Sequence, residues 1–286
     1  MQTVNNYWII LCIQSATVVT MSPLNPTEPP PSGGVLVEVT DGVATLTLDN
    51  PHRKNAINLG MAKQIDQFCA HVESNGHVGA VVVRANGEYF CSGADTRDLA
   101  ASSADPASPE AVSRTSAVYG SFVRIGGLPV PTIARVVGGA VGAGLNLAMA
   151  TDITIVTPDT VLDSGFLARN IHPGGGHLSL LGRATDWSTT IAMAACGQTL
   201  KGQQAVDKGL AHLAIPEDEM DAAIATLTAA AAADPELTRR VMTSARLELG
   251  PPAISWPSAL EIERGVQMWS MSRKGKASWS SRGPQR

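Results

Sequence analysis

The sequence predicts an α/β protein. Strand-like runs rich in β-branched residues alternate with amphipathic helical patterns, and this alternation recurs in the units 43–72, 80–99 and 132–150. The run AVVVR at 80–84 is almost wholly apolar, which is typical of a strand covered on both faces in a parallel sheet. Because such strands are joined by right-handed helical crossovers, we expect a parallel sheet with helices packed against it.

Composition places the chain among globular proteins. Of its 286 residues, 44% are hydrophobic and 16% are charged, with a formal net charge of −4. This length suits one large domain or two small ones. The acidic balance, without a basic stripe carrying interleaved aromatics, argues against a nucleic-acid binder. The four cysteines form no CxxC pair, which favours reduced thiols in the cytoplasm over disulfides or a zinc site.

Residues 1–33 differ from the rest of the chain. The run YWIILCI at 7–13 is apolar but far too short to span a membrane, and it lacks the preceding positive charge of a signal peptide. A proline-rich stretch follows Met21. We interpret 1–33 as a disordered or wrongly assigned N-terminal extension, with Met21 as an alternative start. The other interpretation is a membrane-surface anchor.

The first regular elements after this extension are a hairpin and a capped helix. Strand-like runs at 35–39 and 43–48 flank Asp41-Gly42, a dipeptide typical of a tight hairpin turn. Asn58 is a candidate N-cap, and the following helix carries an apolar stripe comprising Met61, Ile65, Phe68, Cys69 and Val72. After the strand at 80–84 we expect a glycine-bearing loop at 86–95, a flexible loop at 101–110 and a helix that ends near Gly126.

The second half of the chain begins with a strand at 132–137 and glycines at 138, 139, 142 and 144. A helical pattern follows from about Leu145, then short strands at 152–156 and 161–162 and a loop at 172–177. Further helices are expected around 187–195, 202–209, 217–232, 235–248 and 257–271. We divide the chain into a core at 34–215, a helical capping or oligomerisation part at 216–273 and a flexible tail at 274–286.

The glycine-rich stretch at 138–144 is the strongest chemical signal. Where a strand ends at glycines and a helix begins, the first N–H groups of the helix have no intrahelical acceptor. The helix dipole adds partial positive charge there. The stretch therefore predicts a site for an anion, or for an oxygen that becomes one.

Several common motifs are absent from the sequence. Position 147 is leucine, so the glycines do not form the dinucleotide-binding G-x-G-x-x-G, and no P-loop occurs. Ser92 lies outside a nucleophile elbow, because position 90 is Phe. His172 and His177 lie on a predicted loop without clustered carboxylates, so we expect no metal site.

Four segments together resemble the crotonase (enoyl-CoA hydratase/isomerase) superfamily. They are VATLTLDNPHRKNAIN at 43–58, FCSGADTRDL at 90–99, GGAVGAGLNLAMATDITI at 138–155 and the PGGG…LLGR segment at 173–183. The resemblance implies a spiral of ββα turns with two near-perpendicular sheets and a helical C-terminal part that forms homotrimers or homohexamers. It also implies an acyl-CoA ligand, with no cofactor beyond the coenzyme A moiety. The apolar run at 7–13 is too short for a membrane span, so we expect none.

The resemblance assigns a role to individual residues. Two backbone N–H groups, those of Ala94 and Ala143, would form an oxyanion hole that holds the thioester oxygen as an enolate. Alanine at position 143 replaces the usual glycine, so this donor requires a negative φ there. The residues matched to coenzyme A contacts are Lys54, Ala56, Ile57, Ser92, Thr96 and Arg97. Lys54 and Arg97 suit phosphate by their charge.

The chain departs from the family at both hydratase glutamates. The matched positions hold Asn146 and Phe166, and neither side chain exchanges a proton near neutral pH. Asn146 can orient a water or a carbonyl, and Phe166 can shape an apolar pocket. Asp163 and His172 are the nearby candidates for an acid or base. The alternative roles are a turn-capping carboxylate for Asp163 and loop bracing for His172 and His177.

Three functions follow from these residues. The first is an enoyl-CoA hydratase/isomerase-like enzyme that acts on an acyl-CoA thioester in fatty-acid or related metabolism, with the acid–base group altered. The second is a non-catalytic acyl-CoA binder or carrier, motivated by the missing glutamates. The third is a crotonase-fold hydrolase that acts on a diketone without coenzyme A.

Overall fold

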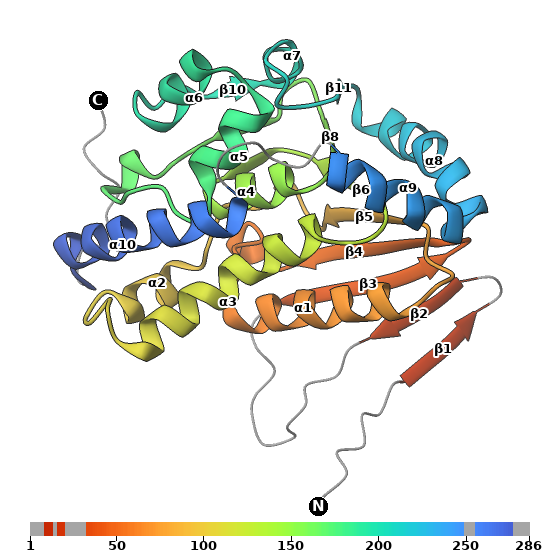
Figure 1. Cartoon of the computed structure of the whole chain (residues 1–286), viewed down its shortest axis with the longest axis horizontal. Helices are drawn as coiled ribbons and strands as arrows, with labels where there is room; N and C mark the ends of the chain where they lie inside the picture. The colour runs from red at the N-terminus through yellow and green to blue at the C-terminus, as the bar shows by residue number, and fades with distance from the viewer. Residues whose placement is uncertain (1–8, 14–15, 21–32, 249–254, 277–286) are drawn as a thin grey trace, which may run out of the picture.

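The computed structural model describes residues 9–13, 16–20, 33–248 and 255–276, and it confirms the α/β class with two sheets (Figure 1). The larger sheet has eight strands in the order β1-β2-β3-β4-β5-β6-β8-β11. These strands are β1 (Ile9–Ile13), β2 (Ala16–Thr20), β3 (Gly34–Thr40), β4 (Val43–Asp49), β5 (Ala80–Ala85), β6 (Thr132–Val136), β8 (Ile153–Val156) and β11 (Leu213–Ala214). The smaller sheet, in the order β10-β9-β7, comprises β10 (Leu200–Lys201), β9 (Val161–Asp163) and β7 (Gly139–Val141).

Ten α-helices and two short 3₁₀ segments are found among the described residues. The α-helices are α1 (Leu59–Ser74), α2 (Thr96–Ser102), α3 (Pro109–Gly126), α4 (Ala143–Ala150), α5 (His177–Ala184), α6 (Trp187–Ala194), α7 (Gly202–Asp207), α8 (Glu217–Ala233), α9 (Pro235–Glu248) and α10 (Trp256–Lys274). The 3₁₀ segments are η1 (Pro51–Arg53) and η2 (Leu167–Arg169).

Strand pairing follows the predicted pattern. β3 and β4 form an antiparallel hairpin in which Thr40 pairs with Val43. Its turn residues, Asp41 at φ 48° and Gly42 at φ 79°, both adopt the left-handed angles of a type I′ turn. β4, β5, β6 and β8 then run parallel to one another. This parallel arrangement confirms the strand–helix crossovers expected from the sequence.

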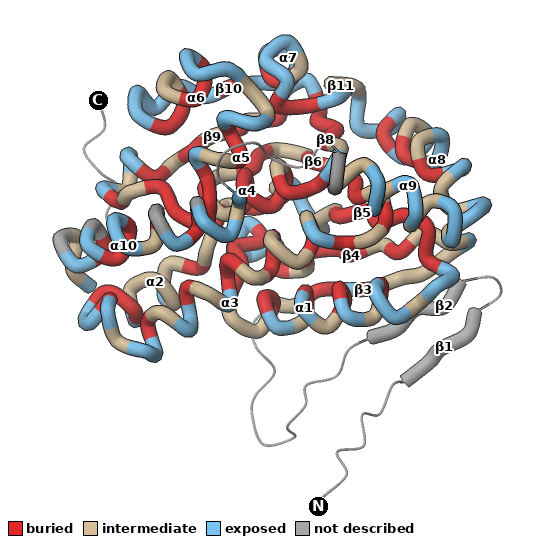
Figure 2. The backbone as a smooth tube through the Cα atoms, in the orientation of Figure 1, coloured by how far each residue is buried: buried red, intermediate tan, exposed pale blue. Residues whose placement is uncertain are grey.

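Helices cover both faces of the parallel strands, as Figure 1 shows. Val81 and Val83 of β5 belong to the main core with residues of α1 and α3, whereas the intervening Val82 packs with Met220 and Ile224 of α8. This alternation is the two-residue period of a strand buried on both sides. The most deeply buried segments therefore lie at the centre of the molecule (Figure 2).

The N-terminus of α1 forms as predicted. The Asn58 side chain accepts a hydrogen bond from the Met61 N–H at 2.8 Å. This bond satisfies one of the N–H groups that have no intrahelical acceptor. The predicted apolar stripe from Met61 to Val72 is buried against the sheet.

Four local predictions are wrong. α2 occupies Thr96–Ser102, with Asp95 as its N-cap, and so includes the first two residues of the flexible loop predicted at 101–110. The glycines after β6 include a further strand, β7, and α4 begins at Ala143 rather than Leu145. The loop predicted at 172–177 ends earlier, since α5 begins at His177.

The start of α5 is stabilised by a distant carboxylate. Glu263 of α10 accepts hydrogen bonds from the N–H groups of His177 at 3.0 Å and Leu178 at 3.1 Å. Burial raises the pKa of Glu263. A cap supplied across 86 residues of sequence cannot be recognised from the local pattern.

The N-terminal extension and the C-terminal tail lie mostly outside the described residues. Within 1–33, the structure describes β1 and β2, which pair with each other, while β2 pairs with β3. The disorder and the alternative start predicted for 1–33 stay predictions, as does the flexible tail beyond residue 276. Within the part of the chain that the structure describes, no helix is both long and apolar enough to pass through a membrane.

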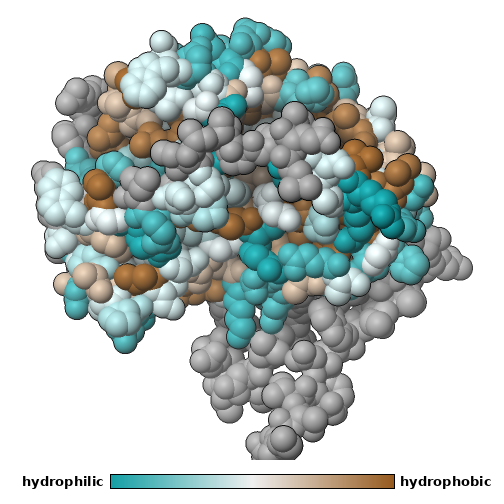
Figure 3. Space-filling model, in the orientation of Figure 1, coloured by the Kyte–Doolittle hydropathy of each residue, from teal (hydrophilic) through white to brown (hydrophobic). Residues whose placement is uncertain are grey.

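Two of the C-terminal helices pack against different parts of the chain: α8 covers one face of the larger sheet, and α10 packs near η2. Met268 and Met271 of α10 pack with Phe166 and Ile171 of the core. On the face shown in Figure 3, brown apolar residues lie in small groups among polar ones. The capping or oligomerisation role expected for 216–273 stays a prediction.

The close approach of two turns requires a glycine at position 144. A Cβ added to Gly144 would lie 2.2 Å from the Cys91 carbonyl oxygen. We expect Gly144→Ala to lower the free energy of unfolding by about 3 kcal/mol, because backbone must move to admit the methyl group. Chemical denaturation measures this change.

Gly120→Ala on α3 is the matched control, because an added Cβ there meets no heavy atom within 4 Å. This substitution should raise stability by about 0.5–1 kcal/mol, since alanine favours the helix interior. Equal stability of the two variants would contradict the close packing of the turns.

Candidate active site

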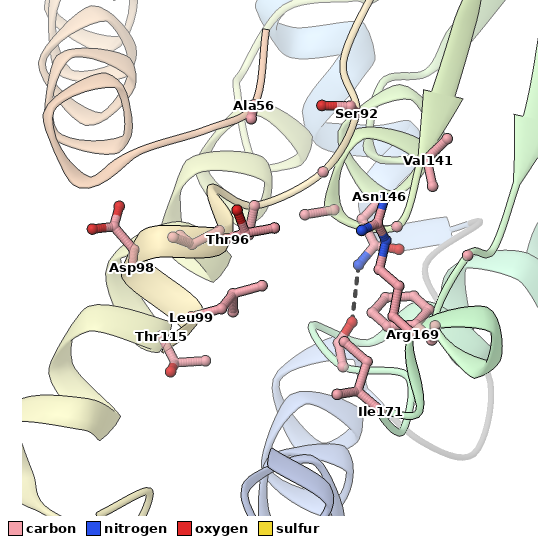
Figure 4. A pocket seen from close by; sticks show the side chains of 18 of the residues that line it. Ala56, Ser92, Thr96, Asp98, Leu99, Thr115, Val141, Asn146, Arg169 and Ile171 are labelled. Carbon is pink, nitrogen blue, oxygen red and sulfur yellow. Dashed lines mark hydrogen bonds between the residues drawn. The ribbon is translucent and has the colours of Figure 1, made fainter. Parts of the chain in front are cut away.

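A cavity of about 280 Å³ lies where the loops after β4 and β5 meet α2, α3, α4 and η2 (Figure 4). Gln267 of α10 also contributes to its wall. Of the residues predicted from the sequence, the cavity brings together Lys54, Ala56, Ser92, Ala94, Thr96, Ala143, Asn146 and Phe166. Ile57, Arg97, Asp163 and His172 do not line it.

The backbone of Ile57 fixes the turn that carries Ala94. The Ile57 N–H donates to the Gly93 carbonyl at 2.8 Å, and the Ile57 carbonyl accepts from the Asp95 N–H at 2.9 Å. Ile57 thus bonds the two neighbours of Ala94. In such a parallel bridge, the N–H of Ala94 itself points away from Ile57. The Ala94 N–H is thereby left without an acceptor among the described residues.

Ala143 occupies the first position of α4, where an N–H has no intrahelical acceptor. The preceding Gly142 takes the left-handed angle, φ 56°. Ala143 is not among the described non-glycine residues with positive φ, so its methyl group is compatible with the turn. Ala143 therefore satisfies the backbone requirement stated from the sequence, namely that its φ is not positive.

The two turns lie against each other. Cys91 donates its N–H to the Gly139 carbonyl, and Val141 donates its N–H to the Cys91 carbonyl. A Cβ added to Gly93 would lie 3.8 Å from the Ala143 nitrogen. Two N–H donors from separate loops thus border one cavity, an arrangement that can stabilise an oxygen as it gains negative charge.

The loop at 52–54 brings basic side chains to the cavity. Lys54 adopts φ 49° as the C-cap of η1, and its carbonyl accepts the Ser92 N–H at 2.9 Å. Its ammonium group lies 5.2 Å from the centre of the Tyr89 ring, a cation–π contact. His52 and Arg53 line the same end of the cavity.

Arg97 binds Asp95 rather than facing the cavity. Its guanidinium donates to both carboxylate oxygens of Asp95, at 3.0 and 2.8 Å. Burial of Asp95 alone would raise its pKa, but the hydrogen bonds from Arg97 outweigh burial and lower it. Because Asp95 also caps α2, Arg97 supports the turn that holds Ala94.

Asn146 is the polar side chain at the centre of the site. The dashed line in Figure 4 marks the hydrogen bond from its side-chain amide to the backbone carbonyl of Gly174. The amide nitrogen donates to Gly174 at 2.9 Å, and the amide oxygen lies 2.7 Å from His177 Nδ1. Since an amide oxygen can only accept, Nδ1 carries the proton. Nε2 of the neutral ring then accepts from the Ser164 hydroxyl at 2.8 Å.

Burial keeps His177 uncharged and lowers its pKa to about 3. Phe166 packs edge-on against the ring, with 4.9 Å between centroids. The two positions matched to the hydratase glutamates thus contact the same neutral histidine. Asn146 is fixed from both ends, so it can orient a ligand but does not exchange a proton.

Asp163 and His172 bind nearby backbone. Asp163 accepts from the Gly165 N–H at 2.9 Å, and burial raises its pKa despite this bond and the nearby Arg169. His172 Nδ1 lies 2.7 Å from the Pro173 carbonyl oxygen. These contacts are those of a turn-capping carboxylate and a loop-bracing imidazole.

Sequence reasoning missed several polar residues that line the cavity. Asp98, Arg114, Tyr119, Arg169 and Gln267 come from α2, α3, η2 and α10. No local motif marks them, because the tertiary fold alone brings these elements together. Within the described residues, no group of His, Cys, Asp and Glu side chains is arranged to hold a metal ion.

Comparison with known proteins identifies the family of this chain. The sequence model of the family described as enoyl-CoA hydratase/isomerase matches residues 38–272. The chain belongs to the enoyl-CoA hydratase/isomerase family. This membership confirms the expected superfamily and the expectation of an enzyme of this type.

Relatives support the same family. A probable enoyl-CoA hydratase of Mycobacterium tuberculosis is 37% identical over 230 residues, covering 80% of this chain and 86% of the relative. The 1,2-epoxyphenylacetyl-CoA isomerase of Escherichia coli is 29% identical over 187 residues, covering 65% of this chain and 71% of the relative.

A solved structure confirms the fold of this family member. An enoyl-CoA hydratase from Bacillus halodurans matches with a TM-score of 0.77 and 19% identity, covering 86% of this chain and 98% of the other. At this identity the likeness concerns the fold alone.

The buried histidine makes the stability of the enzyme depend on pH. Because the folded pKa lies below the ordinary 6.5, the unfolded chain binds the proton more tightly, so stability falls as pH falls from 6.5 toward 3. We expect His177 to contribute a loss of about 2 kcal/mol between pH 7 and pH 5. Denaturant unfolding at both pH values measures the loss.

His177→Asn is the control, because its amide can still donate to the Asn146 oxygen without titrating. The variant is expected to be less stable at pH 7 but to lose less stability on acidification. If the variant and the native chain showed the same pH dependence, His177 would bind its proton equally well in the folded and unfolded chain, and its lowered pKa would be refuted.

Proposed function

We propose that the cavity binds an acyl-CoA thioester whose carbonyl oxygen accepts hydrogen bonds from the N–H groups of Ala94 and Ala143. The observation that carries this proposal is the meeting of two N–H donors, without acceptors among the described residues, at one cavity. Such donors stabilise a developing oxyanion by about 3–4 kcal/mol each. Family membership favours coenzyme A as the carrier of that carbonyl.

The basic end of the cavity suits the phosphates of coenzyme A. His52, Arg53 and Lys54 line this end beside Ser92 and Thr96. Lysine and arginine bind phosphate through charge-assisted hydrogen bonds. The ligand would then enter with its nucleotide at this end and its acyl group toward Asn146 and Phe166.

The reaction we propose needs one proton-transferring group. Hydration of an enoyl thioester requires a group that activates water and one that delivers a proton. Asn146 and Phe166 supply neither, and Asp98 is the only carboxylate that lines the cavity within the described chain. Isomerisation or hydrolysis of an acyl-CoA fits this set of residues better than simple hydration.

The wider setting is part of the same proposal. We assign the protein to fatty-acid or related acyl-CoA metabolism in the cytoplasm, acting as a homotrimer or homohexamer. The exposed Val266 and Trp269 on α10 are apolar positions that subunit contacts would cover.

Removing one N–H donor tests the oxyanion hole. Ala143→Pro deletes the N–H at the first position of α4, where proline is compatible with a helix. We expect kcat to fall by about 10²–10³-fold on the preferred acyl-CoA. Trp187→Pro makes the same change at the exposed start of α6 and should leave kcat unchanged.

Substrate screening separates this proposal from its alternatives. Crotonyl-CoA, longer 2-enoyl-CoAs and saturated acyl-CoAs are followed by absorbance and by calorimetry. Turnover that Ala143→Pro abolishes would support the enzyme, whereas tight binding without turnover would favour a carrier. Failure of every CoA thioester to bind at millimolar concentration would refute the proposal and favour a diketone hydrolase.

A further inference from the structure

We propose that Arg169 binds a carboxylate on the acyl group, so that the substrate is a short acyl-CoA with a second, acidic end. This inference rests on the proposed acyl-CoA function and names its substrate class. Arg169 ends η2 and lines the cavity together with Asn146 and Phe166. Figure 4 shows its side chain extending into the cavity toward Asn146.

Arg169 forms no salt bridge within the described part of the chain, although the carboxylate of Asp163 lies near enough to interact with its charge. Arg97, Arg135 and Arg246 each form an ion pair with a carboxylate, whereas Arg169 forms none. The nearby Asp163 bonds the Gly165 N–H. A guanidinium inside a cavity, with its planar fork of donors unoccupied, is suited to a bidentate contact with a carboxylate.

The surroundings of Arg169 add positive charge and apolar surface. Lys274 of α10 donates from Nζ to the Arg169 carbonyl at 2.6 Å, which places a second cation beside η2. Phe166 and Ile171, both buried, form the apolar wall next to it. A ligand reaching this region would need a short apolar stem and an anionic end.

The position of Arg169 separates an acyl carboxylate from the phosphates of coenzyme A. In Figure 4, Ser92 and Ala56 lie on one side of Asn146, and Ile171 and the base of Arg169 lie on the other. The phosphate-binding cations come from the loop at 52–54, on the Ser92 side. Arg169 therefore faces the acyl portion of the ligand.

The two departures from the hydratase pattern fit the same substrate. Carboxylates at positions 146 and 166 would repel an anionic acyl group in a cavity of low dielectric. Asn146 and Phe166 remove that repulsion, and Arg169 supplies attraction three residues later.

Calorimetry with matched pairs of ligands tests this inference. Succinyl-CoA is compared with butyryl-CoA, and glutaryl-CoA with pentanoyl-CoA, since each pair shares its chain length and differs in the terminal carboxylate. We expect the native protein to bind the acidic member at least about 10-fold more tightly. Equal or weaker binding of the acidic member would overturn the inference without any variant.

Arg169→Met is expected to weaken binding of the acidic ligands by about 10- to 100-fold while sparing the neutral ones. Arg169→Lys should retain part of the preference, because it keeps the charge but loses the planar fork. Arg114→Met removes another cavity cation, on the exposed side of α3, and should leave the preference intact. Loss of the preference in Arg114→Met but not in Arg169→Met would assign the carboxylate to α3 and overturn the proposal.

The same titrations test the role of Arg169 separately from the proposed acyl-CoA function. Binding of butyryl-CoA and succinyl-CoA with equal affinity would refute the role of Arg169 and leave the acyl-CoA function standing. Failure of both neutral and acidic thioesters to bind would refute the acyl-CoA function itself.

Discussion

The backbone contact between the loop after β5 and the turn before α4 is the constraint on which the site depends. Cys91 exchanges hydrogen bonds with Gly139 and Val141, and the Cys91 carbonyl leaves no room for a side chain at Gly144. This contact holds two turns so close that N–H groups from both border one cavity. The proposed oxyanion hole therefore depends on backbone contacts between residues outside it.

Local signals and the resemblance together predicted much of this arrangement. The hairpin at Asp41-Gly42 and the cap at Asn58 are short-range features, so the sequence suffices for them. The cap that Glu263 provides to α5 and the contact between Asn146 and His177 join residues 86 and 31 positions apart. Such long-range partners depend on tertiary packing, and single-sequence patterns do not contain them.

The two positions that the resemblance matches to the hydratase glutamates are neutral in this chain. Asn146 is fixed by His177 and Gly174, and Phe166 packs against the same imidazole. Burial then keeps the histidine uncharged, so these two positions hold and shape a ligand instead of transferring protons. The cavity thus combines two backbone donors with a cationic rather than anionic wall at Arg169.

The vibrational spectrum of a bound thioester tests the central claim most directly. Infrared difference spectra of butyryl-CoA, with and without an isotope label on the thioester carbonyl carbon, isolate that one stretch in the complex. Two hydrogen bonds from Ala94 and Ala143 predict a shift to lower wavenumber on binding, reduced in Ala143→Pro. A carbonyl stretch in the complex that equals the value in water, in native protein and variant alike, would contradict the account.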